Sequence, residues 1–150
     1  MQDKLKSNLK KFFWKEGYLI FNINDNQLIN RINRDVKKII KTKSYKTNTK
    51  IYSYNKSPRI VESYKLSKNC KTLAKHSKIK KIIEYLYKDK AIPFSTINFL
   101  KSTQQPLHSD YAHFGTIPEN KLVGAWVALE NINSESGPLQ IVPRSHKLKR

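Results

Sequence analysis

Hydrophobic side chains recur at helical spacing near the start of the chain. Gly17 interrupts this pattern, and the next four residues, Tyr18–Phe21, form an uninterrupted apolar run. The spacing therefore predicts a helix that stops at Gly17, with a short strand directly after it. The apolar positions of the helix are Leu5, Leu9, Phe12 and Phe13.

A second apolar stripe begins a few residues later and continues to residue 40. Asn24 precedes the stripe and Gln27 stands three positions further on, an arrangement typical of an N-terminal capping box. We expect an amphipathic helix here, with its lysines on the outer face. Its buried stripe is predicted to comprise Leu28, Ile29, Ile32, Val36, Ile39 and Ile40.

The next stretch is polar and has no clear period, so it is expected to be a loop that holds a short strand at Ile51–Tyr54. Another brief strand is predicted at Arg59–Glu62. A third helix is predicted from about Cys70 to Tyr87, because apolar residues share one face there while lysines occupy the other. That apolar face comprises Leu73, Ile79, Ile82, Ile83 and Leu86.

After Pro93 the pattern changes to short apolar or alternating runs separated by turn-forming residues. Such runs are typical of antiparallel strands. Neither an internal repeat nor a low-complexity linker divides the chain. We therefore expect one α+β domain over residues 1–150, with a helical half of about 1–90 and a β half of about 91–150. The runs are Phe94–Leu100, the neighbourhood of His108, Leu122–Glu130 and Leu139–Val142.

The composition argues against a membrane protein, a secreted protein and a protein with disulfides. The 150 residues are 38% hydrophobic, which is enough for a packed core, and no apolar run reaches the length of a membrane span. The lysine-rich start of the chain does not have the pattern of a signal peptide. Cys70 is the only cysteine, so neither an intrachain disulfide nor a thiolate metal cluster can form. We expect a cytoplasmic protein without a membrane partner, in which any metal is held by histidine and carboxylate.

The formal charge of +19 would by itself suggest a nucleic-acid partner. The basic residues are unevenly spread, however: residues 1–90 hold 24 Lys or Arg against 7 Asp or Glu, whereas residues 91–150 hold 6 against 4. Many lysines lie beside isoleucines at helical spacing, where they solvate an outer helix face. No Arg/Gly cluster, zinc-finger pattern or aromatic RNA-binding motif accompanies them, so nucleic-acid binding ranks last among the candidate functions.

His108 and Asp110 are the candidate metal ligands. Residues two apart on an extended strand project from the same face, so this imidazole and this carboxylate can converge on one ion. A histidine from another strand would complete a facial triad of two histidines and one carboxylate, which leaves coordination positions open on Fe(II). The spacing alone is a weak signal, because a hydrogen-bonded pair on a strand has the same pattern.

Three blocks of sequence give this pair a context: Pro106–Asp110, Gly124–Glu130 and Ser136–His146. In order and separation they resemble successive blocks of the phytanoyl-CoA dioxygenase family. The opening segment Phe13–Leu19 is also similar to the amino-terminal region of that family. The resemblance covers nearly the whole chain, and it favours metal ligation over a plain strand pair for His108 and Asp110.

The resemblance implies an incomplete double-stranded β-helix, a cupin-like jelly roll with supporting N-terminal helices. It also implies an Fe(II)- and 2-oxoglutarate-dependent dioxygenase that hydroxylates a small organic substrate, whose identity the motifs do not carry. By the family pattern, His108 and Asp110 are the first two iron ligands and Ser109 points outward between them. Trp126 would form part of the wall around 2-oxoglutarate, although a core aromatic fits that position equally well.

Four further residues carry expectations. His113 is expected to make a capping hydrogen bond or to support a ligand from behind, and His76, among lysines, is expected to be solvated. His146 lies at a plausible distance for a third ligand, but by resemblance it belongs to a motif that structures a loop. Arg144 stands where the family has glycine, so a positive φ at this position would strain the turn.

In the family, a distal histidine and an arginine that pairs with 2-oxoglutarate follow these blocks, and the present sequence ends before them. We therefore expect a C-terminally truncated domain that binds iron and 2-oxoglutarate weakly and is inactive alone. A second chain could supply the missing strands, because an uncovered sheet edge favours pairing. The alternatives are a non-catalytic jelly-roll protein that binds or interacts and, ranked lower, a basic nucleic-acid-binding module.

Overall fold

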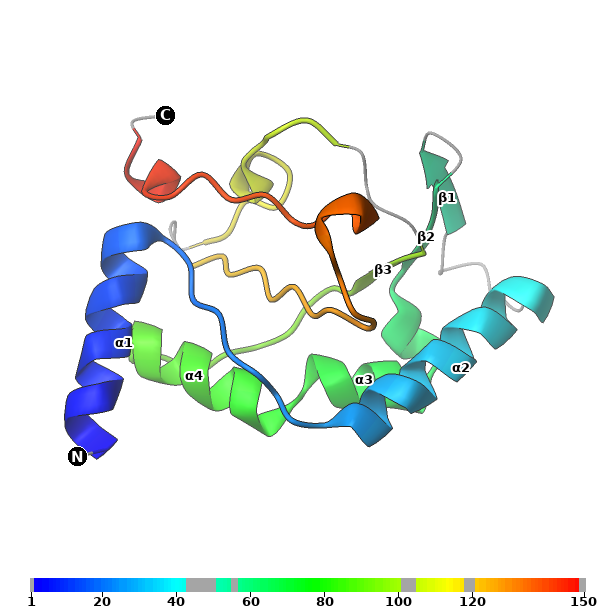
Figure 1. Ribbon diagram of the computed structural model, residues 1–150, viewed down its shortest axis with the longest axis horizontal. Helices are drawn as coiled ribbons and strands as arrows, with labels where there is room; N and C mark the ends of the chain where they lie inside the picture. Colours follow the sequence, from blue (N-terminus) through cyan, green and yellow to red (C-terminus); the bar gives the residue numbers. More distant parts are fainter. Residues whose placement is uncertain (1, 43–50, 55–56, 101–104, 118–120, 149–150) are drawn as a thin grey trace.

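The computed structural model describes residues 2–42, 51–54, 57–100, 105–117 and 121–148. In Figure 1, helix α1 stands at one side and α4 and α3 follow one another along the bottom, while the segments 105–117 and 139–148 lie toward the top and the segment 121–130 crosses the middle. None of the helices in these ranges is both long and apolar enough to cross a membrane. The helices are α1 Gln2–Glu16, α2 Asn26–Thr42, α3 Lys68–Ala74 and α4 Ser77–Tyr87, and the strands are β1 Ile51–Tyr54, β2 Ser57–Val61 and β3 Ile97–Phe99.

Helix α1 forms as its apolar spacing predicts and ends just before Gly17. Gly17 has a φ of 89°, a left-handed conformation that glycine adopts without strain. The strand expected at Tyr18–Phe21 is wrong, because these residues run as an irregular connection between α1 and α2. A strand needs a neighbouring backbone to accept and donate its hydrogen bonds, and the sheet of this molecule is built from β1, β2 and β3 instead.

Helix α2 supplies most of the hydrophobic core. Four of the six residues in its predicted stripe are buried, and a fifth, Ile40, packs against the core. Ile60 of β2 and Cys70 of α3 close over them, so the core joins one helix to the sheet and to a second helix. The buried residues of α2 are Leu28, Ile32, Val36 and Ile39.

The N-terminal cap of α2 is Asp25, and the prediction of Asn24 is wrong. Asp25 Oδ1 accepts a hydrogen bond from the backbone N–H of Leu28 at 3.0 Å, and its carbonyl oxygen accepts from Ile29 at 3.1 Å. These are the two bonds that an N-cap residue makes. Asn24 lies one residue too early and adopts a φ of 56°.

The three strands form one antiparallel sheet in the order β1-β2-β3. Ile51 pairs with Ile60, and Ile60 pairs in turn with Asn98 of β3. The strands expected at Ile51–Tyr54 and from Arg59 to Val61 are confirmed, but Glu62 lies outside β2 with a φ of 60°.

The β half expected after residue 91 is confirmed only at β3 in the part of the chain that the structure describes. In that part β3 is the only strand, and the runs 122–130 and 139–142 lie without strand pairing. An extended run becomes a strand only where another backbone lies at hydrogen-bonding distance. The jelly roll implied by the resemblance is therefore not formed as such among these residues.

The single helix expected over residues 70–87 is two helices, α3 and α4, separated at Lys75 and His76. Cys70 is buried in α3, and Ile79 and Leu86 are buried in α4. Nine residues of continuous helix would turn Ile79 roughly 180° away from Cys70. The break lets both side chains face the interior of the molecule.

Candidate metal centre

His108 and Asp110 lie at the start of a single 3-10 turn, Asp110–Ala112, and not on a strand. Ser109 between them is nevertheless extended, with φ −99° and ψ 123°. An extended residue places its two neighbours on the same side of the backbone. His108 Nε2 accordingly lies 3.4 Å from Asp110 Oδ1, so the pair that the spacing suggested is brought together without the expected strand.

The imidazole of His108 is oriented by its own backbone. Its Nδ1 lies 2.8 Å from the carbonyl oxygen of Pro106. Because a carbonyl oxygen only accepts, Nδ1 must carry the hydrogen and donate it. In the neutral ring Nε2 then holds a lone pair directed toward the carboxylate of Asp110. Two acceptors at this separation repel each other unless a proton or a metal ion lies between them.

The separation of these two atoms suits a divalent metal. Two ligands at about 2.1 Å from an ion and at right angles to each other lie roughly 3 Å apart, close to the 3.4 Å between Nε2 and Oδ1. The side chains of His108 and Asp110 are 34% and 61% exposed, so an ion can reach them from solvent. No group of three or more His, Cys, Asp or Glu side chains among the described residues could hold a metal ion. The pair therefore fits as part of a site.

His113 packs against His108. The two rings meet edge to face with their centroids 5.6 Å apart, and the backbone N–H of His113 donates to the carbonyl oxygen of Asp110 at 3.0 Å. The turn at Asp110–Ala112 thus carries His113 back toward the first candidate ligand. His113 is thus the C-terminal cap of this turn, in agreement with the capping hydrogen bond expected of it, and its ring contacts that of His108.

The segment 121–130 passes beside the carboxylate of Asp110. A Cβ atom placed on Gly124 would lie 3.4 Å from Asp110 Oδ2. The same segment is tied to α2, because Asn33 Nδ2 donates to the carbonyl oxygen of Leu129 at 2.6 Å. Trp126 lies between these two anchors and is 48% exposed, so in this structure it is not a core aromatic. Its role toward 2-oxoglutarate stays a prediction.

His146 and Arg144 anchor the last described segment to the end of α1. His146 Nε2 lies 3.1 Å from the carbonyl oxygen of Trp14, and its ring fills the space that a Cβ atom on Gly17 would need. The backbone N–H of Arg144 donates to the carbonyl oxygen of Glu16 at 2.8 Å. His146 thus contacts the end of α1, which is far in sequence from the candidate ligands.

The side chains of Arg144 and Glu16 also pair. Nε and Nη2 of Arg144 donate to the two carboxylate oxygens of Glu16 at 3.1 and 3.3 Å. These hydrogen bonds hold the pKa of the Glu16 carboxyl below its usual range. Arg144 has a φ of 65°, the positive value anticipated for this position, so the ion pair accompanies a backbone conformation that disfavours arginine.

His76, expected to be solvated, is mostly buried. Its side chain is 13% exposed, and its Nε2 lies 4.0 Å from Asp25 Oδ2. Its Nδ1 is buried without a hydrogen-bond partner in the part of the chain that the structure describes. The break between α3 and α4 turns this residue inward, which the pattern of lysines around it did not indicate.

Several contacts, at the candidate site and at the end of α1, could not be predicted from the sequence. Gly124 opens a block that the resemblance singled out, but nothing in the chain marks it as the neighbour of Asp110. The contacts of Arg144 and His146 join positions 128 and 132 residues apart. Local spacing carries no signal for pairs so distant.

Comparisons with known proteins agree with the blocks described above. The sequence pattern of the family described as Phytanoyl-CoA dioxygenase (PhyH) matches residues 13–150. The peroxisomal phytanoyl-CoA dioxygenases of Bos taurus and Mus musculus are each 40% identical to the chain over 47 residues, and the human protein is 38% identical over 47 residues. Each match covers 31% of this chain and only 14% of the relative.

A solved structure shares part of the fold. The chain aligns with the epimerase SnoN, solved in complex with Fe3+, alpha-ketoglutarate and nogalamycin RO, at a TM-score of 0.50 and 13% identity. The alignment covers 69% of this chain and 40% of SnoN. At this identity the likeness is one of fold.

Proposed function

Since this chain belongs to the phytanoyl-CoA dioxygenase family, we propose that His108 and Asp110 are two ligands of a mononuclear Fe(II) site in a 2-oxoglutarate-dependent oxygenase. The observation that carries the proposal is the 3.4 Å separation of His108 Nε2 and Asp110 Oδ1. Their orientation suits a shared cation. When bound, the iron and 2-oxoglutarate would supply the oxidising chemistry that protein side chains lack.

Three residues of this chain would orient the ligands, supply charge and leave space for the metal. The carbonyl oxygen of Pro106 holds the hydrogen on Nδ1 of His108 and so presents Nε2 to the metal. Asp110 contributes a negative charge, which stabilises a divalent ion. Gly124 leaves the carboxylate of Asp110 room to turn toward the metal, since a larger residue would contact it.

Trp126 would border the co-substrate. It lies two residues beyond Gly124 on the segment that passes Asp110, and nearly half of its surface is exposed. An aromatic side chain beside a metal site excludes water and offers 2-oxoglutarate an apolar wall. The substrate itself would be a small organic molecule, since neither fold nor motif transfers a substrate's identity.

The finer architecture belongs to the same proposal. We expect the runs 122–130 and 139–142 to be strands of an incomplete jelly roll that pair when another backbone, such as that of a second chain, lies beside them. Exposed apolar side chains along these runs support this expectation. They include Trp126, Leu139, Ile141 and Val142.

Metal binding by the 150-residue chain tests the ligand assignment. Mn(II) is a suitable probe because it does not oxidise as readily as Fe(II), and calorimetry gives its affinity. We expect His108→Ala and Asp110→Asn each to weaken binding by about tenfold or more, because each removes a donor atom. Asp89→Asn is the matched control, since Asp89 is an exposed carboxylate that pairs with Lys121.

The outcomes separate the candidate functions. If His108→Ala bound Mn(II) as tightly as the wild type, the ligand assignment would be wrong, and the chain would be better described as a non-catalytic binding or interaction protein. With two donors among the described residues, we also expect the 150-residue chain alone to be inactive. Iron-dependent release of succinate from 2-oxoglutarate by this chain would contradict that expectation.

A further inference from the structure

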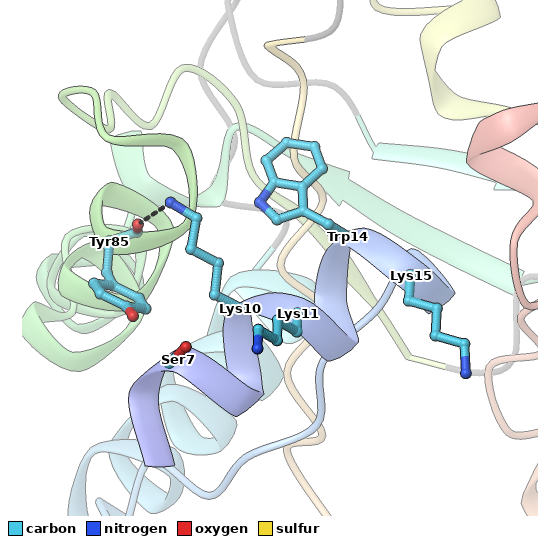
Figure 2. A pocket seen from close by; sticks show the side chains of 6 residues that line it. All are labelled: Ser7, Lys10, Lys11, Trp14, Lys15 and Tyr85. Atoms are coloured by element: carbon cyan, nitrogen blue, oxygen red, sulfur yellow. Dashed lines mark hydrogen bonds between the residues drawn. The ribbon is translucent and has the colours of Figure 1, made fainter. Parts of the chain in front are cut away.

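An open groove of about 560 Å³ lies between α1 and α4, on helices that do not carry the candidate metal ligands. Figure 2 shows five of its residues on α1 and one, Tyr85, on α4. The groove is open along most of its extent, so a ligand would lie against it and not inside an enclosed cavity. The lining residues are Ser7, Lys10, Lys11, Trp14, Lys15 and Tyr85.

The groove is positively charged. Three of its lining residues are lysines and none is acidic. Lys11 and Lys15 lie one helical turn apart, where like charges repel. Lys11 has no ion pair among the described residues, whereas Lys10 donates to the carbonyl oxygen of Tyr85 at 3.4 Å and lies over the ring of Tyr85, 5.6 Å from its centroid.

The acidic partner of Lys15 is Glu16, and Lys15 binds it only weakly. Its Nζ lies 3.5 Å from Glu16 Oε1, but that carboxylate is already bound through both oxygens by Arg144. Lys15 therefore shares the single charge of this carboxylate with Arg144, which compensates Lys15 only in part. Figure 2 shows Lys10 directed to Tyr85, which leaves Lys11 and Lys15 as the two lysines that can turn toward a phosphate.

The walls of the groove are aromatic. Trp14 and Tyr85 are 42% and 41% exposed, which is high for large rings that also pack against the protein. Tyr87 contacts Trp14 at a ring-centroid distance of 5.2 Å and holds the indole in place from another side. A rigid indole with open surface offers a flat ring a place to stack.

We propose that this groove binds a small phosphorylated ligand that carries a flat aromatic ring, of the class of the nucleoside polyphosphates. Its phosphates would lie against the ammonium groups of Lys11 and Lys15, and its ring against Trp14. An unpaired Lys11, a partly compensated Lys15 and the exposed ring of Trp14 match both parts of such a ligand.

Three probes separate the contribution of the phosphates to binding from that of the aromatic ring. They are ATP, adenosine and inorganic tripolyphosphate. In a Trp126→Phe background Trp14 is the only tryptophan, so its fluorescence reports binding in the groove. We expect ATP to quench this fluorescence and to bind at least about tenfold more tightly than either adenosine or tripolyphosphate, because only ATP supplies both charge and ring.

Charge variants locate the site. Lys11→Gln with Lys15→Gln should weaken ATP binding by roughly tenfold. Lys37→Gln with Lys38→Gln on α2 removes the same charge from another exposed helix face and should change binding by less than about twofold. Circular dichroism of both double variants shows whether the helices are retained.

Three results would overturn the proposal. Tripolyphosphate that binds as tightly as ATP would show that the aromatic walls make no contribution. Equal weakening by the two double variants would show attraction to the overall positive charge. A single-stranded oligonucleotide that binds while ATP does not would identify a nucleic-acid surface in place of a small-molecule site.

Discussion

Gly124 matters because of the carboxylate beside it. Its backbone is not in the left-handed region, so a side chain is compatible with the local conformation. An added Cβ atom would touch Asp110 Oδ2 at 3.4 Å, an ordinary contact, whereas the branched side chain of valine would reach further and displace the carboxylate. We expect Gly124→Ala to change Mn(II) affinity by less than about twofold and Gly124→Val to lower it by about tenfold, as measured by calorimetry.

Gly115 provides the control for these substitutions. A Cβ atom on Gly115 would meet nothing within 4 Å, so Gly115→Val should leave Mn(II) affinity unchanged. Equal affinity in Gly124→Val and the wild type would show that Asp110 does not need its present position to bind metal.

Glu16 should make the stability of the chain depend on pH. Arg144 lowers the pKa of this carboxyl in the folded chain below its ordinary value of 4.5. The pair therefore stabilises the folded state above about pH 4.5, and this contribution is lost as the pH falls through the lowered pKa. We expect Glu16→Gln to lower the free energy of unfolding at pH 7, and the difference from the wild type to shrink toward pH 3, as measured by urea denaturation.

Glu130→Gln is the matched control, because Glu130 is exposed and has no ion pair among the described residues. It changes the net charge equally, so any general effect of the high positive charge appears in both variants. A deficit of Glu16→Gln that stayed constant between pH 7 and pH 3 would argue against the ion pair as its source.

At the scale of single elements, the start of α2 offers a direct measurement. Asp25 Oδ1 caps the helix through the backbone N–H of Leu28. Removing this acceptor by Asp25→Ala should lower the free energy of unfolding by about 1 kcal/mol, whereas Asp25→Ser keeps a capping oxygen and should cost only a few tenths. Both variants lose the contact between Asp25 and His76. The difference between their free energies of unfolding, measured by urea denaturation, therefore reports the capping hydrogen bond alone. Equal stability of the two variants would contradict the assignment.

The sequence predicted the helices better than the strands. The stripe of α2 repeats every three or four residues, and its burial follows from that repeat alone. The break between α3 and α4 was missed, because each half has a valid helical pattern and only the position of the core requires Cys70 and Ile79 to face the same way. Tyr18–Phe21 was assigned to a strand, but whether an apolar run pairs depends on a neighbour that local sequence does not specify.

Across the whole molecule, burial is concentrated in the helical half. The buried hydrophobic residues lie on α2, β2, α3 and α4, whereas every described residue from Asn131 to Leu148 is exposed. The C-terminal segment is held mainly by its contacts with the end of α1, at Glu16 and Trp14. The block Ser136–His146 therefore lies entirely in exposed chain, whereas Leu129 of the block before it packs against the core.

The sequence by itself determined the chemistry of the candidate site. His108 and Asp110 are two residues apart, and an extended residue between them is enough to bring their side chains together, whatever element forms around them. The family was equally readable, because its blocks are local. The tertiary structure alone decided that Gly124 lies beside Asp110, that His76 is buried, and that Arg144 pairs with Glu16. These contacts depend on how separate segments pack, and packing is set by the burial of the whole apolar surface and not by spacing within any one segment.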